Sequence, residues 1–380
     1  MKRGVLLFIC LILLTGCWDQ RLLKNARIVF GSAYDLTEDG EIKKTVVIRT
    51  VNQQGGQAQQ GGGATVSEFV TAEASTVREA RREVDRQVSG EITHVKNNSF
   101  ILGEEMAAKS DLQELFDGFY RDPRSPLGTK VFVVEGEAED VLRSGNVGET
   151  IIGEYLYELL NEAELLGMVD HMDIQLAHTV MLDEGRDVAM PYLSYSEENE
   201  RYIVDGIALF HDQNYTGKVV HPKDAPLLLM MDGWFAKRIR FVKKVNDEKE
   251  TDGDKVEDYI NIAVTKMKRK IKVKGTNADN LTVNINLNLK VRVDEYAKNN
   301  LKDIKVRKEL DKKLSAMLTK DAQEVINTLQ EANSDYLGIG RRLIAYHPKV
   351  WKELNWEKDY PNIKIIPNVK IEIVNTGILT

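Results

Sequence analysis

Residues 266–293 read KMKRKIKVKGTNADNLTVNINLNLKVRV, and this stretch carries the clearest strand signal in the chain. Every second residue from Lys266 to Lys274 is a lysine, and three of the four residues between them are apolar. After the turn-forming segment 275–280, apolar side chains return at every second position from Val283 to Val293. Because successive side chains of a strand point to opposite faces, the pattern predicts a long antiparallel hairpin with one wet face.

The lysines of this hairpin allow two interpretations. Five lysines on one strand face could meet anionic lipid or a cell-envelope polymer, at about 1 kcal/mol for each lysine near the surface. Alternatively, they form a solvated face that keeps an edge strand from pairing with a neighbouring chain. The second interpretation is the more common one for such a run.

The segments that follow the hairpin predict a helix and a final strand. Residues 310–329 place apolar side chains on one continuous stripe, which indicates a long helix that packs on the dry face of the hairpin. The stripe consists of Leu310, Leu314, Met317, Leu318, Val325 and Leu329. An alternating strand is expected at 364–374. Together these elements predict a C-terminal α/β domain over residues 257–380.

The N-terminal part of the chain mixes strand and helix signals. Strands are expected at 26–33, 43–51, 98–103 and 130–135, with a turn at 38–40 that makes the first two a hairpin. Thr76 and Glu79 form a capping box before an amphipathic helix, and further helices are expected at 107–120 and from Ile152 to Gly167. Residues 52–64 hold only Gly, Gln, Asn and Ala, which is typical of a loop tip. Residues 17–195 are therefore expected to form an N-terminal α/β domain.

A polar, turn-rich stretch at 190–200 indicates a domain boundary. Beyond it, strands are expected at 203–211 and 217–220, joined by a turn at 212–215, and a charged surface loop is expected at 246–254. These elements predict a small middle domain over residues 196–256. The fold class is then α+β (mixed α/β), a three-domain extracytoplasmic lipoprotein with mainly antiparallel sheets packed by helices.

The first seventeen residues predict a secreted, lipid-anchored protein. Lys2 and Arg3 precede an apolar stretch at 5–14, which is too short to span a bilayer and is typical of a signal peptide over residues 1–16. The run Leu-Thr-Gly-Cys at 14–17 fits a bacterial lipoprotein box, so Cys17 is expected to carry an S-diacylglyceryl group and, as a further addition, an N-acyl chain. The alternative is an ordinary signal peptide that ends near a cysteine.

Charge and cysteine content exclude several classes of protein. The 380-residue chain has a net charge of −7, and loss of residues 1–16 would leave 364 residues at −9, which argues against nucleic acid as a partner. The only cysteines are Cys10, inside the signal peptide, and Cys17. No disulfide or cysteine-bound zinc is therefore expected in the mature protein.

The sequence contains none of the common catalytic or metal-binding motifs that we looked for. The six histidines are scattered and never stand at metal-ligand spacing, so His171 and His178 are expected to be surface or hydrogen-bonded structural residues. Neither a Gly-x-Ser-x-Gly elbow nor a Walker sequence occurs. We therefore predict a protein that is not an enzyme, with no catalytic, cofactor-binding or metal-binding residues.

Several segments together resemble the Ger(x)C family of spore germination lipoproteins. They are the lipoprotein box running into Cys17-Trp18-Asp19, residues 204–210 followed by Gly217-Lys218, and residues 335–340 followed by Trp351 and Trp356. One departure is Arg21-Leu22-Leu23, where family members often carry an acidic residue. The resemblance spans nearly the whole chain.

The resemblance implies a role as the C subunit of a GerA-type nutrient germinant receptor. Such a subunit has three α/β domains and is held by lipid on the outer face of the spore inner membrane, beside polytopic A and B subunits. Only Cys17 carries over as a functional position, and a scaffolding or coupling role is expected. Whether the subunit contacts the nutrient stays open, and the alternative function is an extracytoplasmic solute-binding lipoprotein that captures the nutrient itself. A third interpretation, a lipid-anchored envelope hydrolase, lacks a nucleophile or metal signature.

Overall fold

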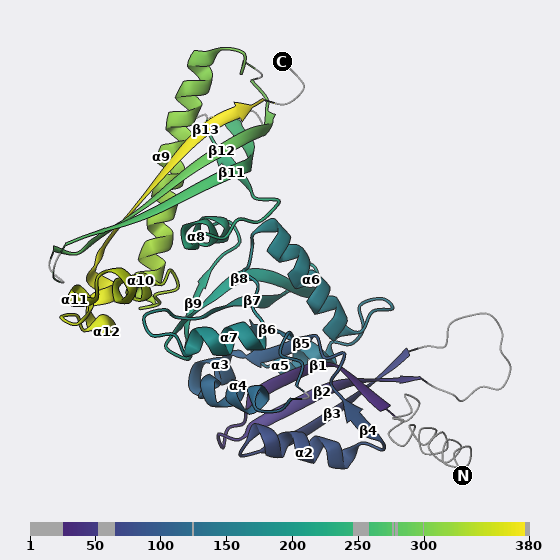
Figure 1. Cartoon of the computed structure of the whole chain (residues 1–380). Helices are drawn as coiled ribbons and strands as arrows, with labels where there is room; N and C mark the ends of the chain where they lie inside the picture. The colour runs from purple at the N-terminus through teal and green to yellow at the C-terminus, as the bar shows by residue number, and fades with distance from the viewer. Residues whose placement is uncertain are drawn as a thin grey trace, which may run out of the picture.

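A computed structural model describes residues 26–51, 65–123, 125–245, 258–275, 277, 280–298 and 300–376. Cys17, the glycine-rich stretch 52–64 and the charged stretch 246–254 lie outside these residues. Within them the chain forms a large sheet and a smaller one, each covered by helices (Figure 1). The predicted mixed α+β fold class is confirmed.

The first sheet has the strand order β3-β2-β1-β5-β6-β7-β8-β9, with the short β4 beside β1. Its strands are β1 (Ala26–Leu36), β2 (Ile42–Val51), β3 (Thr65–Ala74), β4 (Glu91–Thr93), β5 (Ser99–Gly103), β6 (Lys130–Val134), β7 (Ala189–Ser196), β8 (Arg201–His211) and β9 (Asn214–Val220). The central strands β1, β5, β6 and β7 are parallel, and the outer ones are antiparallel. The predicted hairpin of β1 and β2 is confirmed, and Gly40 in its turn has φ +81°.

Helices cover both faces of this sheet. They are α2 (Val77–Gln87), α3 (Glu104–Lys109), α4 (Leu112–Tyr120), α5 (Ala138–Arg143), α6 (Ile152–Leu166) and α7 (Ile174–Met181). Alternation along β5 shows how the layers are sorted: Phe100 and Leu102 pack in the cluster with α3, α4 and α7, whereas Ile101 packs with α5 and α6. This is the three-layer arrangement expected when parallel strands are buried on both faces.

Local signals placed most helix ends correctly. Thr76 Oγ1 accepts the N–H of Glu79 at 3.2 Å, as the capping box predicts, and Gly167 ends α6 with φ +75°. The single helix predicted over 107–120 is wrong, because the chain breaks at Ser110. Asp111 then starts a new helix, α4, by accepting the N–H of Glu114 at 2.9 Å.

A domain boundary is predicted between residues 195 and 196, in the polar stretch 190–200. In the structure this stretch contains the turn of the hairpin formed by β7 and β8. Ser196 pairs with Arg201, and β7 and β8 belong to one continuous sheet. The turn predicted at 212–215 is shorter than expected, since only Asp212 and Gln213 lie between β8 and β9. The division into domains 17–195, 196–256 and 257–380 stays a prediction.

The second sheet has the order β10-β11-β12-β13 and packs against the long helix α9. Its elements are β10 (Arg240–Lys244), β11 (Tyr259–Lys274), β12 (Thr282–Tyr296), α9 (Ile304–Glu331) and β13 (Lys364–Asn375). The long hairpin is confirmed, with Lys268 opposite Asn288, and Leu314 and Leu318 of α9 are fully buried. Because β13 runs parallel to β12, the chain needs a long crossover, and α9 at about 42 Å supplies it.

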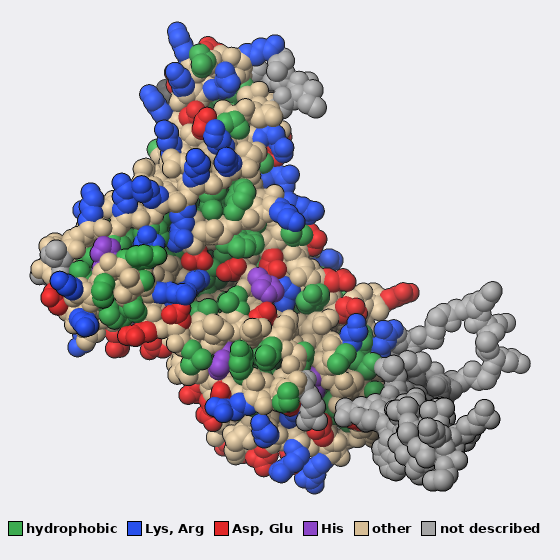
Figure 2. Space-filling model, viewed as in Figure 1, with side chains coloured by type: hydrophobic (Ala, Val, Ile, Leu, Met, Phe, Trp, Pro, Cys, Tyr) green, Lys and Arg blue, Asp and Glu red, His purple; other side chains and the backbone are tan. Residues whose placement is uncertain are grey.

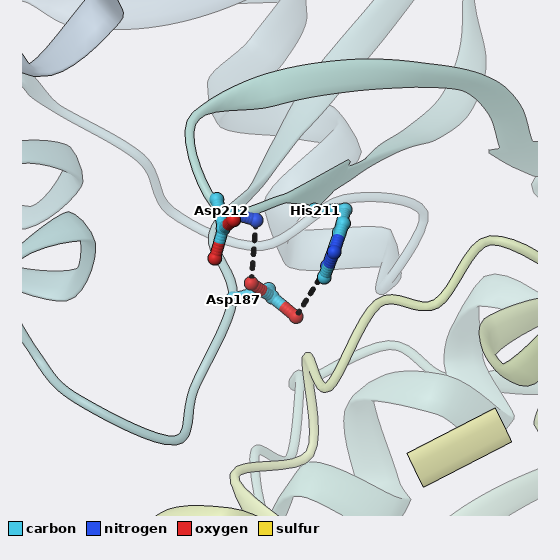
Figure 3. A group of neighbouring side chains, drawn as sticks. All are labelled: Asp187, His211 and Asp212. Carbon is cyan, nitrogen blue, oxygen red and sulfur yellow. Dashed lines mark hydrogen bonds and ion pairs between the residues drawn. The ribbon is translucent and has the colours of Figure 1, made fainter. Parts of the chain in front are cut away.

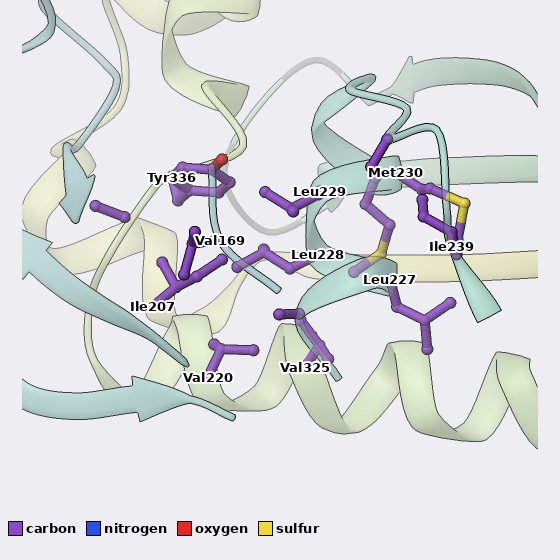
Figure 4. Packing of buried hydrophobic residues seen from close by; sticks show 14 of the residues in the cluster. Val169, Ile207, Val220, Leu227, Leu228, Leu229, Met230, Ile239, Val325 and Tyr336 are labelled. Atoms are coloured by element: carbon purple, nitrogen blue, oxygen red, sulfur yellow. The ribbon is translucent and has the colours of Figure 1, made fainter. Parts of the chain in front are cut away.

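One short helix, α8 (Ala225–Asp232), connects the cores of the two sheets. Its residues 225–231 are all buried, and an all-apolar helix is stable only inside a protein. Figure 4 shows Leu228 beside Val169 and Ile207 of the first part and near Val325 of α9, and Leu229 belongs to the same cluster. A single apolar cluster thus extends through both sheets. None of the helices in the described ranges is long and apolar enough to cross a membrane.

Candidate functional site

Segments that are far apart in the sequence meet where the first sheet contacts the end of the chain beyond α9. We call the contact of residues 183–187 with residues 333–341 the joint. Beside it lies a hollow of about 470 Å³, with walls from residues 181–187 and 211–213 on one side. The other wall contains Asn333 and aromatic residues of three short helices, α11 (Pro348–Trp351), α12 (Trp356–Asp359) and the 3₁₀ helix η4 (Tyr360–Asn362).

The joint is made first of all by backbone groups. The N–H of Arg341 donates to the carbonyl of Gly185 at 2.7 Å, and the N–H of Asp187 donates to the carbonyl of Asp335 at 3.2 Å. In return, the N–H of Asp335 donates to Oδ2 of Asp187 at 2.6 Å. Two backbone–backbone bonds and one bond to the Asp187 carboxylate therefore fix the two segments side by side.

Two glycines allow this close approach. Gly185 has φ +79°, and a Cβ there would lie 2.5 Å from the nitrogen of Arg341. A Cβ on Gly340 would lie 2.8 Å from Nε1 of Trp356 and 2.9 Å from the Cα of Gly185. Because real Cβ atoms do not approach backbone this closely, any larger residue at either position would push the segments apart.

Asp335 organises the C-terminal side of the joint. The residue is 1% exposed, and its two carboxyl oxygens accept the N–H groups of Ile339 at 2.8 Å and Gly340 at 2.7 Å. These are the first N–H groups of α10 (Ile339–Tyr346), so the carboxyl group satisfies donors that the helix itself leaves unpaired. Burial raises the pKa of Asp335 well above its ordinary value, against the effect of both N–H groups.

The aromatic residues quoted for the family resemblance pack on this side. The ring centroids of Trp351 and Trp356 are 5.3 Å apart, and those of Trp356 and Tyr360 are 5.5 Å apart. The Tyr360 hydroxyl donates to the carbonyl of Ser334 at 2.8 Å, next to the buried carboxyl group. The tryptophans therefore hold the C-terminal segment in place.

Asp187, His211 and Asp212 form a group with ligand atoms within 4.8 Å of one another (Figure 3). Oδ1 of Asp187 accepts the N–H of Asp212 at 2.8 Å, while Oδ2 accepts from Asp335. His211 Nδ1 lies 3.9 Å from Oδ2, and the nearby Asp187 carboxylate raises the pKa of His211. Since each Asp187 oxygen already accepts a peptide N–H, we assign the group a structural role: it ties the turn between β8 and β9 to the joint.

The structure brings together most of the segments that the sequence singled out. Residues 204–210 lie in β8, which leads to His211, and Lys218 in β9 forms an ion pair with Glu331 of α9 at 3.2 Å. Cys17 lies outside the described residues. Sequence reasoning missed Gly185 and Asp187, because Asp-Glu-Gly-Arg-Asp at 183–187 has the pattern of an ordinary polar turn.

Two family models together match nearly the whole chain. Residues 19–195 match the model described as "Spore germination protein N-terminal domain", and residues 205–377 match "Spore germination B3/ GerAC like, C-terminal". The matches define a spore germination protein. The gap between the two matched ranges, residues 196–204, falls in the hairpin of β7 and β8. The chain belongs to the Ger(x)C family of these proteins, as the resemblance predicts.

Individual relatives agree with the family models. The chain is 24% identical over 379 residues to the spore germination protein GerQC of Bacillus cereus, covering 100% of this chain and 99% of that protein. It is also 24% identical to the spore germination protein KC of Bacillus subtilis (strain 168), covering 99% and 95%. The crystal structure of the GerBC protein has the same fold, with a TM-score of 0.53 at 17% identity, covering 94% of this chain and 100% of that one.

Proposed function

We propose that this chain is the C subunit of a nutrient germinant receptor of an endospore. In this role it is anchored by lipid at Cys17 on the outer face of the spore inner membrane, and it couples the membrane-embedded A and B subunits without catalysing a reaction. The observation that carries the proposal is the joint: residues 335–340 of the family resemblance form one side of it through hydrogen bonds, and Trp356 lies against Gly340 there.

The physical requirements of coupling fit this arrangement. A diacylglyceryl group with an N-acyl chain would give stable attachment, at about 0.8 kcal/mol per buried methylene, whereas a single acyl chain is marginal. Attachment confines the body near its partners at a high effective concentration. The joint and the shared core around α8 make the two sheets one body, so a displacement imposed on one of them moves the other.

The same architecture gives less support to the alternative of a solute-binding lipoprotein. Such proteins usually have two similar lobes joined by hinge strands. In the described residues, one sheet has nine strands with a parallel centre, and the other has four strands and a single long crossover helix.

Replacement of the anchor tests the proposed location. We expect Cys17→Ala in sporulating cells to release the chain from the membrane fraction and to abolish the germination response to nutrients. Cys10→Ala is the matched control, because Cys10 lies in the signal peptide and its loss leaves the lipoprotein box intact. Normal membrane retention of the Cys17 variant would show that the lipid assignment is wrong.

Isolation of the complex tests the proposed partners. A tagged chain, extracted with mild detergent from spore membranes, should bring the A and B subunits with it. Asp187→Asn should keep this association but weaken the nutrient response, because an amide in place of Oδ2 would face the N–H of Asp335 with a donor instead of an acceptor. Asp111→Asn, at the start of α4, is the control. Recovery of the chain without either subunit would contradict the receptor role.

A further inference from the structure

A second hollow of about 370 Å³ lies beside the joint, where β11 runs past α8 and α10 (Figure 1). Charged and apolar walls meet in it. The charged residues are Arg186, Arg269, Arg341, Arg342 and a single carboxylate, Asp232. The apolar side is made by Ile271, Leu337, Ala345 and Tyr346. Four guanidinium groups thus meet one carboxylate around this hollow, in a chain whose net charge is −7.

The carboxylates around the hollow account for only two of these arginines. Asp232 Oδ2 pairs with Nη2 of Arg186 at 3.2 Å, and Asp183, outside the hollow, pairs with Nη1 of Arg341 at 2.9 Å. Arg342 lies over the ring of Tyr346, with its guanidinium carbon 5.2 Å from the centroid.

Arg269 is the residue that most clearly lacks a counterpart. Its Nε is buried and has no hydrogen-bond acceptor in the described part of the chain. Gly233, with φ +105°, leaves the space for this guanidinium, since a Cβ there would come within 2.7 Å of Nη1. Burial lowers the pKa of Arg269, and the charges of Arg342 and Arg186 lower it further. Buried charges are normally compensated by an opposite charge. The one carboxylate near Arg269 in the hollow is Asp232, and it already pairs with Arg186.

We propose that this hollow binds a small organic oxyanion, either a carboxylate or a phosphate monoester. The planar forks of Arg269 and Arg342 match the two oxygens of such a group, and the apolar side beside Tyr346 would take its carbon part. The ligand supplies the negative charge that Arg269 and Arg342 lack. The inference does not rest on the proposed receptor role, because it concerns binding by this chain alone.

Arginine side-chain NMR spectra of the full-length chain, purified in mild detergent and labelled with ¹⁵N-arginine, test the proposal. The probes are benzoate, phenyl phosphate and inorganic phosphate, with ionic strength held constant by sodium chloride. We expect a saturable shift of the Arg269 Nε–H resonance with benzoate or phenyl phosphate. Benzoate alone would identify a carboxylate site, and phenyl phosphate alone would identify a phosphate-ester site. Inorganic phosphate should bind more weakly, since it cannot use the apolar side.

Substitutions decide whether the arginines form the site. Arg269→Gln and, separately, Arg342→Gln should each weaken binding at least about tenfold, as expected for loss of a charge-assisted hydrogen bond. Arg238→Gln is the matched control, because Arg238 pairs with Glu162 on the surface. If circular dichroism shows that the Arg269→Gln variant is not folded, the result for Arg342→Gln decides the test. No saturable shift up to about 50 mM of any probe, or equal effects in the control variant, would overturn the proposal.

Discussion

At the scale of single residues, His171 is a histidine whose pKa is set by two neighbouring carboxylates. Its Nε2 lies 3.3 Å from Oδ2 of Asp173, and its Nδ1 lies 3.3 Å from Oε1 of Glu164. Hydrogen bonds to Asp173 and then to Glu164 raise the pKa of His171 from 6.5 to about 9. Glu164 also pairs with the buried Lys130, so the histidine belongs to a network that connects α6 with β6. This agrees with the prediction of a hydrogen-bonded structural histidine.

The raised pKa gives His171 a pH-dependent effect on stability. A group whose pKa is higher in the folded state stabilises fully below its unfolded pKa, and the effect is lost as the pH rises through the folded value. We expect His171→Gln to lower the free energy of unfolding by about 1 kcal/mol at about pH 6, a modest value because the ring is half exposed. The difference from the unmodified chain should shrink between pH 6.5 and about 9. Urea unfolding at several pH values measures it, with His347→Gln as control, and a difference that does not change with pH would contradict the assignment.

At the scale of elements, the two edges of the second sheet are protected in different ways. Polar side chains one helical turn apart on α9 accept the outward N–H groups of β13. Val369 donates to Oγ1 of Thr319 at 3.0 Å, Ile371 to Oγ of Ser315 at 2.9 Å, and Ile373 to Oδ1 of Asp311 at 2.8 Å. On the opposite side, β10 pairs only with residues 259–263 of β11, so residues 266–274 form an edge among the described strands. Lys266, Lys268, Lys270, Lys272 and Lys274 are exposed there.

The lysine-bearing edge should resist pairing with other chains. Lys and Arg side chains gather over the part of the molecule formed by this sheet and α9 (Figure 2). We expect the double variant Lys268→Val, Lys272→Val to form dimers or larger species, because an edge strand with fewer charges repels a neighbouring strand less and still offers it unpaired backbone groups. Light scattering over a range of concentrations measures this. Lys370→Val on β13 is the control, since α9 covers that edge. A double variant that stays monomeric would favour the other interpretation of the lysines, contact with an anionic surface.

At the scale of the whole molecule, the cluster around α8 should make the two sheets unfold together. Leu229 is fully buried in the apolar cluster that contains residues of both sheets. We expect Leu229→Ala to lower the free energy of unfolding by about 2–5 kcal/mol and to reduce the hydrogen-exchange protection of both sheets by the same factor. Leu176→Ala, at a position that is 37% exposed on α7, should change little. Protection lost in one sheet alone would show that the sheets are separate folding units.

The sequence predicts those parts of this architecture that depend on neighbouring residues. The Thr76 cap, the end of α6 at Gly167 and the alternation in β11 and β12 are local signals, and all were confirmed. The joint could not be predicted in the same way, because Asp187 and Asp335 are 148 positions apart and the sequence around Asp187 has the pattern of an ordinary polar turn. The break before Asp111 was missed for another reason, since the apolar periodicity continues across it. Family resemblance indicated the important C-terminal residues, but not what they contact.

The crossing of Gly185 and Gly340 also limits how members of this family can exchange parts. Two backbones meet there with no room for a side chain, so the two positions form one steric unit although they lie in opposite halves of the chain. A recombinant that joins the first half of one family member to the second half of another would assemble only if the first parent supplies glycine at position 185 and the second supplies glycine at position 340. The two halves of the chain are therefore expected to tolerate exchange only as pairs that match at this crossing.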